Sequence, residues 1–300
     1  MVMPAIATFI PVFPLLMTAE ITQGLSIWQS IVVGIVQGIT EFLPISSTAH
    51  IKMVPVVLGW GDPGVAFTAV VQLGSIGAIL SYFWADVKTV CQGMARAIAH
   101  RQFEDTDFQV GLGILVGTLP IVVCGLLLKF FLRESYETLA RGSVVIGITS
   151  IALALLLGVA EWRGKRHRGY DKVGLWDGIG MGWAQALALI PGVSRSGATI
   201  TAGLFMGFDR PTAARFSLLM GIPAIVLSGI AELDQLFAPD FQMGGGAIAA
   251  GVISAAISSY LAIYWLLHFL RTHTTWVFVF YRIAFGTAIL WGVASQKIPN

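Results

Sequence analysis

Two polar segments interrupt an otherwise apolar chain and decide how it folds. They read Gln37-Gly-Ile-Thr-Glu41-Phe-Leu-Pro44-Ile-Ser46-Ser47-Thr48-Ala-His50 and Pro191-Gly192-Val-Ser194-Arg195-Ser196-Gly197-Ala-Thr199. Each combines Pro with hydroxyl residues in the middle of an apolar region, so a continuous helix is broken there. Irregular backbone at membrane depth is tolerated only where it is buried in protein or lines a watery cavity. We therefore interpret residues 27–58 and 175–207 as two re-entrant hairpins, each made of two half-helices.

The rest of the composition is that of an integral membrane protein. Of the 300 residues, 56% are hydrophobic and only 11% are charged, whereas soluble domains carry about 25% charged residues. Six apolar runs are long enough to span a bilayer, which takes about 20 residues: 65–84, 110–132, 143–160, 213–231, 246–270 and 276–293. The net charge of +2 gives no electrostatic reason to expect nucleic-acid binding.

The distribution of charge sets the predicted orientation. Basic residues crowd the linker at 163–172, and such clusters stay on the cytoplasmic side. The loop at 232–240 has acidic residues but no Lys or Arg, which suits the opposite side. Threading the spans between these two anchors places residues 85–109 inside and the loop near 133–141 outside. The first hairpin then enters from outside and the second from inside.

This order predicts an all-α integral membrane fold built as an inverted repeat of two re-entrant helical hairpins plus six transmembrane helices. Within a single polytopic domain of residues 1–300, residues 26–160 form the first repeat and 173–294 the second, after an irregular apolar lead-in at 1–25. Pro191 follows Pro44 by 147 residues, and the same offset pairs Ser194 with Ser47. Inverted-repeat membrane proteins place their site where broken helices of the two halves meet, so we expect both serines at one cavity.

The first polar segment carries the groups of a phosphate-handling site. Gln37 and Glu41 are four residues apart and share one helix face. Pro44 disfavours helix at the residue before it, so the first half-helix should end near position 43. Three residues that favour helix N-caps follow, and a helix N-terminus is a ready anion site: Ser46, Ser47 and Thr48. His50 is expected about one turn into the next half-helix, on the side of the serines.

The second segment supplies a cation in similar surroundings. Arg195 carries a planar fork suited to two phosphate oxygens, and hydroxyl residues that can cap or bind surround it: Ser194, Ser196 and Thr199. The plainer alternative is that Arg195 pairs with Glu41 only to hold the helices together. Ionisable groups inside a membrane are usually kept for function, which favours a site. The sequence does not decide whether Arg282 contacts lipid headgroups or bridges helices. Lys52 is a further candidate for phosphate contact.

Together these residues resemble the undecaprenyl pyrophosphate phosphatase family of the bacitracin-resistance type. The resemblance runs from about residue 27 to the end of the chain and rests on Gln37-x-x-x-Glu41 with Pro44 to His50, and on Pro191 to Thr199. It implies the inverted-repeat fold and a multi-pass enzyme of the bacterial plasma (inner) membrane. It also implies removal of the terminal phosphate from a polyprenyl pyrophosphate, which recycles the lipid carrier for cell-wall synthesis and confers bacitracin resistance. Many members carry Glu where this chain has Gln37, which shifts weight to Glu41.

The residues suggest a division of labour for this reaction. Ser47 is the predicted nucleophile, and Glu41 or His50 takes its proton. The sequence does not choose between these two bases, nor between covalent catalysis and direct attack by water. Arg195 is expected to stabilise the transferring phosphoryl group, and substrate contacts are predicted for Gln37, Ser46, Thr48, Ser194, Ser196 and Thr199. A divalent cation, Mg²⁺ or Ca²⁺, is expected to bridge Glu41 and the pyrophosphate.

Two other classes of protein share parts of this pattern. A secondary transporter or flippase of a phosphorylated lipid has the inverted repeat and the midplane site, but the combination of nucleophile, base and phosphate-binding Arg favours an enzyme. The type-2 phosphatidate phosphatase family does similar chemistry, but its Pro-Ser-Gly-His signature does not occur in this sequence. The expected partners are the polyprenyl pyrophosphate and membrane lipids, and the sequence leaves open whether the chain forms a homodimer.

Overall fold

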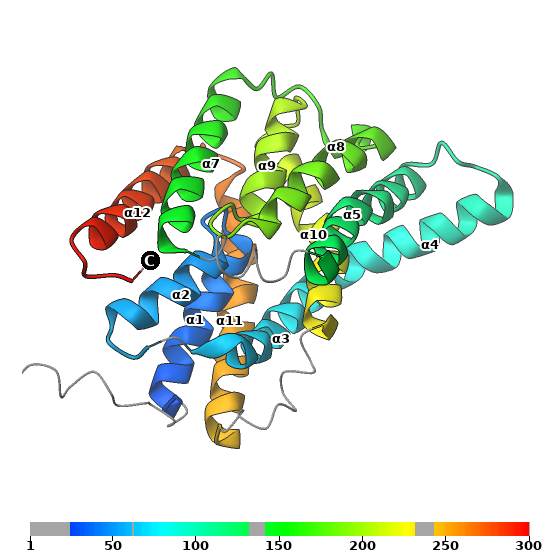
Figure 1. The fold of residues 1–300 in the computed structure, drawn as a ribbon. Coiled ribbons are helices and arrows are strands. Elements are labelled where there is room, and N and C mark those ends of the chain that lie inside the picture. The colour runs from blue at the N-terminus through cyan, green and yellow to red at the C-terminus, as the bar shows by residue number, and fades with distance from the viewer. Residues whose placement is uncertain (1–24, 62, 132–141, 232–242, 300) are drawn as a thin grey trace, which may run out of the picture.

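The described part of the chain is built from helices (Figure 1). The computed structural model describes residues 25–61, 63–131, 142–231 and 243–299. The first half contains α1 (Ile27–Phe42), α2 (Ser47–Val57), α3 (Gly64–Tyr82), α4 (Trp84–His100), α5 (Thr106–Phe131) and α7 (Ser143–Arg163). The second half contains η2 (Tyr170–Lys172), α8 (Leu175–Ala186), η3 (Leu187–Leu189), α9 (Arg195–Phe205), α10 (Arg210–Ala231), α11 (Gly245–Phe269) and α12 (Trp276–Ala294).

The predicted membrane spans are confirmed as long apolar helices. Five helices are long and apolar enough to cross a bilayer: α5, α7, α10, α11 and α12. A sixth candidate is the bent pair of α3 and α4, whose axes differ by 65°. The fold is therefore the all-α integral membrane architecture that the composition predicts. The predicted lead-in at 1–25, the loop at 133–141 and the acidic loop at 232–240 lie almost wholly outside the described residues.

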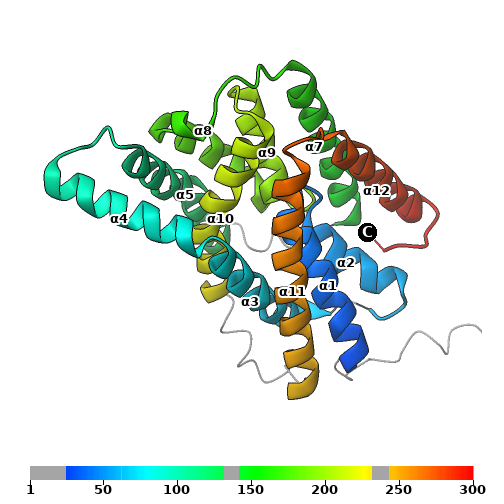
Figure 2. The same cartoon turned by 180° about the vertical axis from the view of Figure 1, so that it is seen from behind.

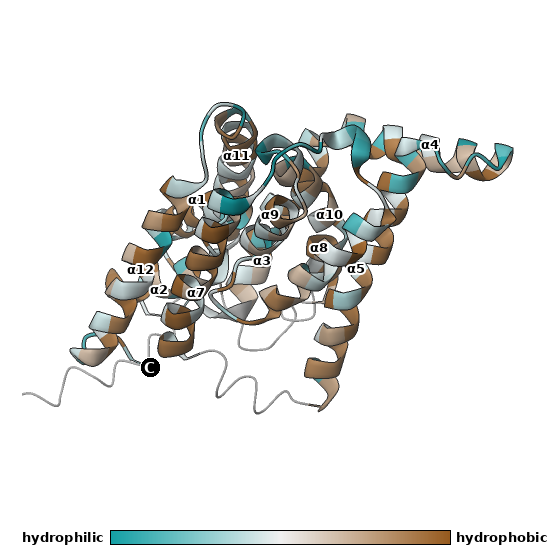
Figure 3. Ribbon diagram, turned by 90° about the horizontal axis from the view of Figure 1, so that it is seen from above, coloured by the Kyte–Doolittle hydropathy of each residue, from teal (hydrophilic) through white to brown (hydrophobic). Residues whose placement is uncertain are grey.

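One element, α4, was not predicted as a helix. Residues 84–100 fall in the stretch that charge assigns to the cytoplasmic side, and they are too polar to read as a span. The structure shows that they nevertheless form a helix that leaves α3 at a sharp bend and packs chiefly along α5. Figure 3 shows α4 projecting from the body, with hydrophilic residues near its far end, whereas α5 and α7 present mainly hydrophobic surfaces. Its polarity suits a helix at the membrane surface.

Both polar segments form the breaks of helical hairpins, as predicted. α1 ends at Phe42, and Leu43 is its C-cap with extended backbone, because Pro44 stops the helix one residue later. α2 then starts at Ser47 after the N-cap Ser46. In the second half α8 and the short η3 lead to Pro191, and α9 starts at Arg195. Each hairpin therefore presents a helix N-terminus at its tip.

The two tips are structurally equivalent. The residues that correspond in the structure, however, differ by one position from those that the sequence offset pairs. The N-caps Ser46 and Ser194 both have left-handed backbone, with φ of 77° and 72°. This conformation is uncommon for residues other than glycine. The helices that follow are 11 residues each, so Ser47 corresponds to Arg195 and not to Ser194. The second tip has one extra residue, Gly192, between its Pro and its helix, and this shifts the match by one.

The packing of the hairpins agrees with an inverted repeat. The first helix of each hairpin lies against a long span of the other half, α1 against α11 and α8 against α5; Figure 2 shows α11 beside α1. Glycines permit both contacts, since a Cβ at Gly38 would lie 2.5 Å from the Ala255 carbonyl oxygen and one at Gly178 would lie 2.2 Å from that of Gly113. If the two halves exchanged places, α1 would take the place of α8 and α11 the place of α5, so the two contacts are equivalent within the repeat. This arrangement brings both tips to the middle of the molecule.

Ion pairs fasten the end of the molecule that carries the basic linker. Glu161, buried near the end of α7, accepts hydrogen bonds from three side chains: Arg166, Arg210 and Thr275. Arg168 donates to both carboxylate oxygens of Asp177 at 2.8 and 2.7 Å. A bidentate pair of this kind fixes geometry as well as charge. The linker is therefore held against the ends of α7 and α8.

Candidate functional site

A cavity of about 560 Å³ lies where the two hairpin tips meet. Its polar lining comes from both halves of the chain. The first hairpin contributes Gln37, Glu41, Ser46, Ser47, Thr48 and Lys52, and the second contributes Gly192, Ser194 and Arg195, while Gln72 of α3 adds an amide. Most of the predicted site residues are thus brought together, although Gln37 and Arg195 are 158 positions apart in sequence.

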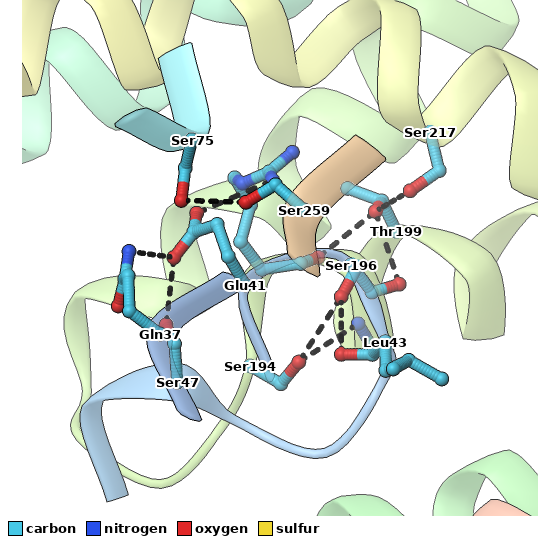
Figure 4. Close-up of polar contacts among 12 residues, drawn as sticks. Gln37, Glu41, Leu43, Ser47, Ser75, Ser194, Ser196, Thr199, Ser217 and Ser259 are labelled. Atoms are coloured by element: carbon cyan, nitrogen blue, oxygen red, sulfur yellow. Dashed lines mark hydrogen bonds and ion pairs between the residues drawn. The ribbon is translucent and has the colours of Figure 1, made fainter. Parts of the chain in front are cut away.

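Glu41 is the centre of the polar contacts in this cavity (Figure 4). Its Oε2 accepts a hydrogen bond from Ser47 Oγ at 2.8 Å and another from Gln37 Nε2 at 3.3 Å. The α1 helix places Gln37 one turn before Glu41, and the break at Pro44 turns the chain so that Ser47 comes back to face it. A hydroxyl next to a carboxylate is the arrangement that activates a serine as a nucleophile.

Arg195 approaches Glu41 from the opposite hairpin. Its Nη2 lies 3.5 Å from Glu41 Oε1, and both side chains are about one-tenth exposed. The predicted alternative, an ion pair between these residues, is therefore present. The pair is longer than a normal hydrogen bond, and Nε, Nη1 and Nη2 of Arg195 have no hydrogen-bond partner in the described residues. A buried guanidinium with its donors unused is costly, and an anion in this cavity would supply the missing acceptors.

A glycine makes room for this guanidinium. A Cβ at Gly221 of α10 would lie 1.6 Å from Nη1 of Arg195, which is far inside van der Waals contact. The backbone of α10 therefore forms the wall on which the guanidinium rests. No pattern in the sequence signals the contact of this glycine with Arg195.

Two residues predicted to contact substrate make hydrogen bonds within the protein instead of lining the cavity. Ser196 Oγ donates to the Leu43 carbonyl at 3.0 Å and so joins the two tips. Thr199 Oγ1 lies 2.6 Å from Ser217 Oγ and ties α9 to α10. Both residues are fully buried and neither lines the cavity. The structure thus places them behind Arg195, whereas Ser194 lines the cavity and caps α9 through Gly197 N.

His50 also points away from the cavity. Its Nδ1 lies 2.7 Å from the Ser46 carbonyl oxygen, and its Nε2 lies 2.6 Å from Tyr281 Oη of α12. The ring stacks on Phe285 with a centroid distance of 4.0 Å. Because both ring nitrogens are engaged elsewhere and Glu41 holds the Ser47 hydroxyl, the geometry favours Glu41 as the base.

Arg282, undecided from the sequence, bridges helices and hairpins. It is completely buried and donates only to backbone carbonyls. Its partners are Pro44 at the first tip, Gly192 and Val193 at the second, and Ser150 of α7. No local sequence pattern signals such a contact, because carbonyl acceptors exist at every position and the partners lie at least 89 residues away.

The cavity continues from the polar centre along an apolar wall. This wall is formed by α5, η3 and α10, with Ile121, Leu126, Leu189, Ile225 and Leu227 among its residues. Lys129 near the end of α5 and Ala231 at the end of α10 mark its far limit. These ends lie away from the basic linker, which Figure 1 shows at the top, after α7.

Comparison with known proteins gives a matching family model and several closely similar relatives. A family model described as "Bacitracin resistance protein BacA" matches residues 30–288. An undecaprenyl-diphosphatase of a Nostoc species is 55% identical over 279 residues, which cover 93% of this chain and 87% of the relative. The undecaprenyl-diphosphatase of Synechococcus elongatus is 54% identical and is covered completely, with 95% of this chain aligned. That of Trichodesmium erythraeum is 51% identical over 93% of this chain and 90% of the relative.

Proposed function

Because the chain belongs to the bacitracin resistance protein BacA family, we propose that it is an undecaprenyl-diphosphatase of the bacterial inner membrane. It hydrolyses undecaprenyl diphosphate to the monophosphate and inorganic phosphate, and so returns the lipid carrier to cell-wall synthesis. The observation that carries this proposal is the meeting of Ser47, Glu41 and Arg195 in one cavity, with the serine hydroxyl 2.8 Å from the carboxylate.

Ser47 is the attacking group in the first step. Its Oγ forms a bond to the terminal phosphorus while the bond from that phosphorus to the bridging oxygen breaks, and undecaprenyl monophosphate leaves. The hydroxyl proton passes to Glu41 Oε2, with which Ser47 already shares a hydrogen bond. Glu41 hands this proton to the departing monophosphate and is again a carboxylate. Water then attacks the phosphoserine and gives a proton to Glu41, which returns it to Ser47 Oγ as the bond from phosphorus to Oγ breaks, and inorganic phosphate is the second product.

Charge stabilisation comes from the second hairpin and from the helix ends. Arg195 offers a buried fork of unused donors to the phosphoryl oxygens, and such donors act most strongly where water is excluded. α2 and α9 begin at the cavity with Ser47 and Arg195, so both positive dipole ends point to the same place. Binding of the diphosphate would draw Arg195 from its loose pair with Glu41 and leave this carboxylate to Ser47.

The oxygens around Glu41 fit a hard divalent cation that is shared with the substrate. Gln37 Oε1 is buried beside this carboxylate and has no hydrogen-bond partner in the described residues. Glu41 and Gln37 would hold the ion, and the diphosphate would supply further oxygen ligands, which is how Mg²⁺ is commonly bound. The described residues contain no cluster of three His, Cys, Asp or Glu that could hold a metal alone. When bound, the ion would neutralise charge on the diphosphate.

The cavity is proposed to open on the external side of the membrane. Its apolar wall ends near Lys129 and Ala231, away from the basic linker that the positive-inside rule assigns to the cytoplasm. The undecaprenyl chain would follow this wall of α5 and α10 toward the lipid, while the diphosphate reaches the two tips.

The test is phosphate release from undecaprenyl diphosphate by the purified protein in detergent, with and without Mg²⁺, beside Ser47→Ala and Arg195→Ala. We expect release by the wild type and losses of at least about a thousandfold in both variants, since each removes part of a cooperative catalytic unit. Near-normal turnover of Ser47→Ala would exclude the covalent step and leave direct attack by water. Tight binding without release by a folded wild-type protein would point to a lipid carrier.

A further inference from the structure

The contact between Tyr281 and His50 lies outside the cavity, yet His50 is bonded to the residue that precedes the proposed nucleophile. Tyr281 belongs to α12 and His50 to α2, and 231 residues separate them in sequence. Neither side chain lines the cavity. His50 is 4% exposed and adjoins the tip that carries Ser46 and Ser47.

The hydrogen bonds fix which nitrogen of His50 carries the proton. The Ser46 carbonyl can only accept, so Nδ1 at 2.7 Å must be the donor. In a neutral imidazole Nε2 is then the acceptor, and the Tyr281 hydroxyl at 2.6 Å donates to it. The ring is further held flat against Phe285, with an interplanar angle of 4°. His50 is thus locked in one tautomer and one orientation.

The group that His50 holds is the strained residue of the first tip. Ser46 has φ of 77°, and it makes no side-chain capping hydrogen bond. The equivalent Ser194 does cap its helix, through Gly197 N. Ser46 lines the cavity, and its carbonyl oxygen accepts two hydrogen bonds from His50, one from the backbone N–H at 3.3 Å and a shorter one from Nδ1 at 2.7 Å. The imidazole thus adds to the helical hydrogen bond that the first tip already has. Strained backbone persists only where its surroundings fix it.

We propose that Tyr281 and His50 are positioning residues: Tyr281 fixes the tautomer of His50, and the Nδ1–H of His50 holds the Ser46 backbone so that Ser47 meets Glu41. His50 carries no proton to or from substrate in this scheme. The inference rests on the proposed reaction with Ser47 as the attacking group. It applies to the rate of the chemical step and not to the binding of the diphosphate.

The experiment compares kcat and KM of the full-length enzyme for undecaprenyl diphosphate in detergent. Tyr281→Phe keeps the ring and removes only the hydroxyl, so we expect kcat to fall roughly three- to tenfold, the value of one hydrogen bond, with KM unchanged. The matched control is Tyr264→Phe on α11, an exposed tyrosine whose ring stacks on His268, and it should leave both constants as they are.

The His50 series separates positioning from proton transfer. Asn carries an amide N–H near the place of Nδ1 but cannot relay a proton, so His50→Asn should keep most of the activity that His50→Ala loses. In the His50→Asn background, Tyr281→Phe should cause no further loss, because its effect passes through the imidazole. Melting temperatures of all variants in the same detergent show which of them fold.

Three results would overturn the inference. One is a Tyr281→Phe enzyme with wild-type kcat. Another is a folded His50→Asn enzyme as inactive as His50→Ala, which would restore His50 as a proton carrier. The third is full additivity of the two changes. An inactive wild type, or a Ser47→Ala enzyme with normal turnover, would instead overturn the proposed function itself.

Discussion

At the scale of single residues, the position of Arg195 depends on the absence of a side chain at position 221. A Cβ there would overlap Nη1 of Arg195 at 1.6 Å, so the guanidinium must leave its observed place on α10. We expect Gly221→Ala to lower kcat/KM roughly 10- to 100-fold, the value of displaced charge-assisted hydrogen bonds. Phosphate release by the purified variant measures this loss.

The control for this change is Gly77→Ala in α3, where an added Cβ has no neighbour within 4 Å. Both substitutions favour helix by about 1 kcal/mol, so thermal stability should not fall in the control. Wild-type activity of Gly221→Ala would mean that Arg195 need not occupy its observed place. The pair of variants thus separates the position of the guanidinium from general effects of glycine replacement.

The residues of the site could be predicted where chemistry and local spacing coincide. Gln37, Glu41 and Ser47 are close in sequence, and helix periodicity with the break at Pro44 predicts that they meet. Polar type alone did not reveal which hydroxyls face the cavity: Ser196 and Thr199 resemble ligands in sequence but hold neighbouring backbone and side chains. That distinction depends on rotation of α9 against α10, which no sequence spacing records.

At the scale of elements, α12 holds both hairpin tips through Arg282. Arg282→Met keeps the length of the side chain but leaves buried carbonyl oxygens at Pro44, Gly192 and Val193 without their donor. Each unsatisfied buried group costs about 1–3 kcal/mol, so we expect a loss of at least about 3 kcal/mol. The melting temperature in detergent should fall clearly, and turnover should fall with it.

The matched control is Arg271→Met in the exposed turn between α11 and α12, which removes the same charge from water. A large drop in both variants would attribute the effect to net charge and not to the hairpin tips. An unchanged melting temperature for Arg282→Met would show that the tips are held by other contacts, such as that of Ser196 with Leu43.

The contact of α1 with α11 gives a second prediction at this scale. A Cβ at Gly38 would lie 2.0 Å from Ser258 Oγ and 2.5 Å from the Ala255 carbonyl oxygen. Backbone cannot yield as a flexible side chain does, so Gly38→Ala should destabilise the protein by about 1–3 kcal/mol through overpacking. Thermal unfolding beside Gly77→Ala checks the sign, and a stability gain in both variants would contradict close packing of these helices.

The elements themselves were predictable to different degrees. Pro and hydroxyl residues within apolar runs predicted both hairpins, and run length predicted the spans. α4 was missed because its mixed polarity resembles a loop, although its residues support a helix that packs on α5. The repeat register was one residue out because Gly192 lengthens the second tip, and an alignment on proline cannot reveal where the next helix begins.

At the scale of the whole molecule, orientation in the membrane decides which side the cavity serves. The basic linker at 163–172 and α4 are assigned to the cytoplasm, whereas Lys129 lies at the far limit of the cavity. The two native cysteines, Cys91 of α4 and Cys124 of α5, are both free. Cys91 is exposed and serves as an internal marker once Cys124 is replaced by Ser.

We expect a membrane-impermeant maleimide added to intact cells to label Lys129→Cys, in a background of Cys91→Ser and Cys124→Ser, but not Cys91 in Cys124→Ser. Permeabilised cells should give labelling of both, which shows that each thiol is reactive. Bound undecaprenyl diphosphate should slow labelling of Lys129→Cys, because the diphosphate and first isoprenoid units occupy the same cavity. Labelling of Cys91 alone from outside would mean that the protein has the opposite orientation in the membrane, with hydrolysis at the cytoplasmic face. Since the two halves pack as an inverted repeat around one centre, only charge distinguishes these orientations, and this experiment tests that charge assignment directly.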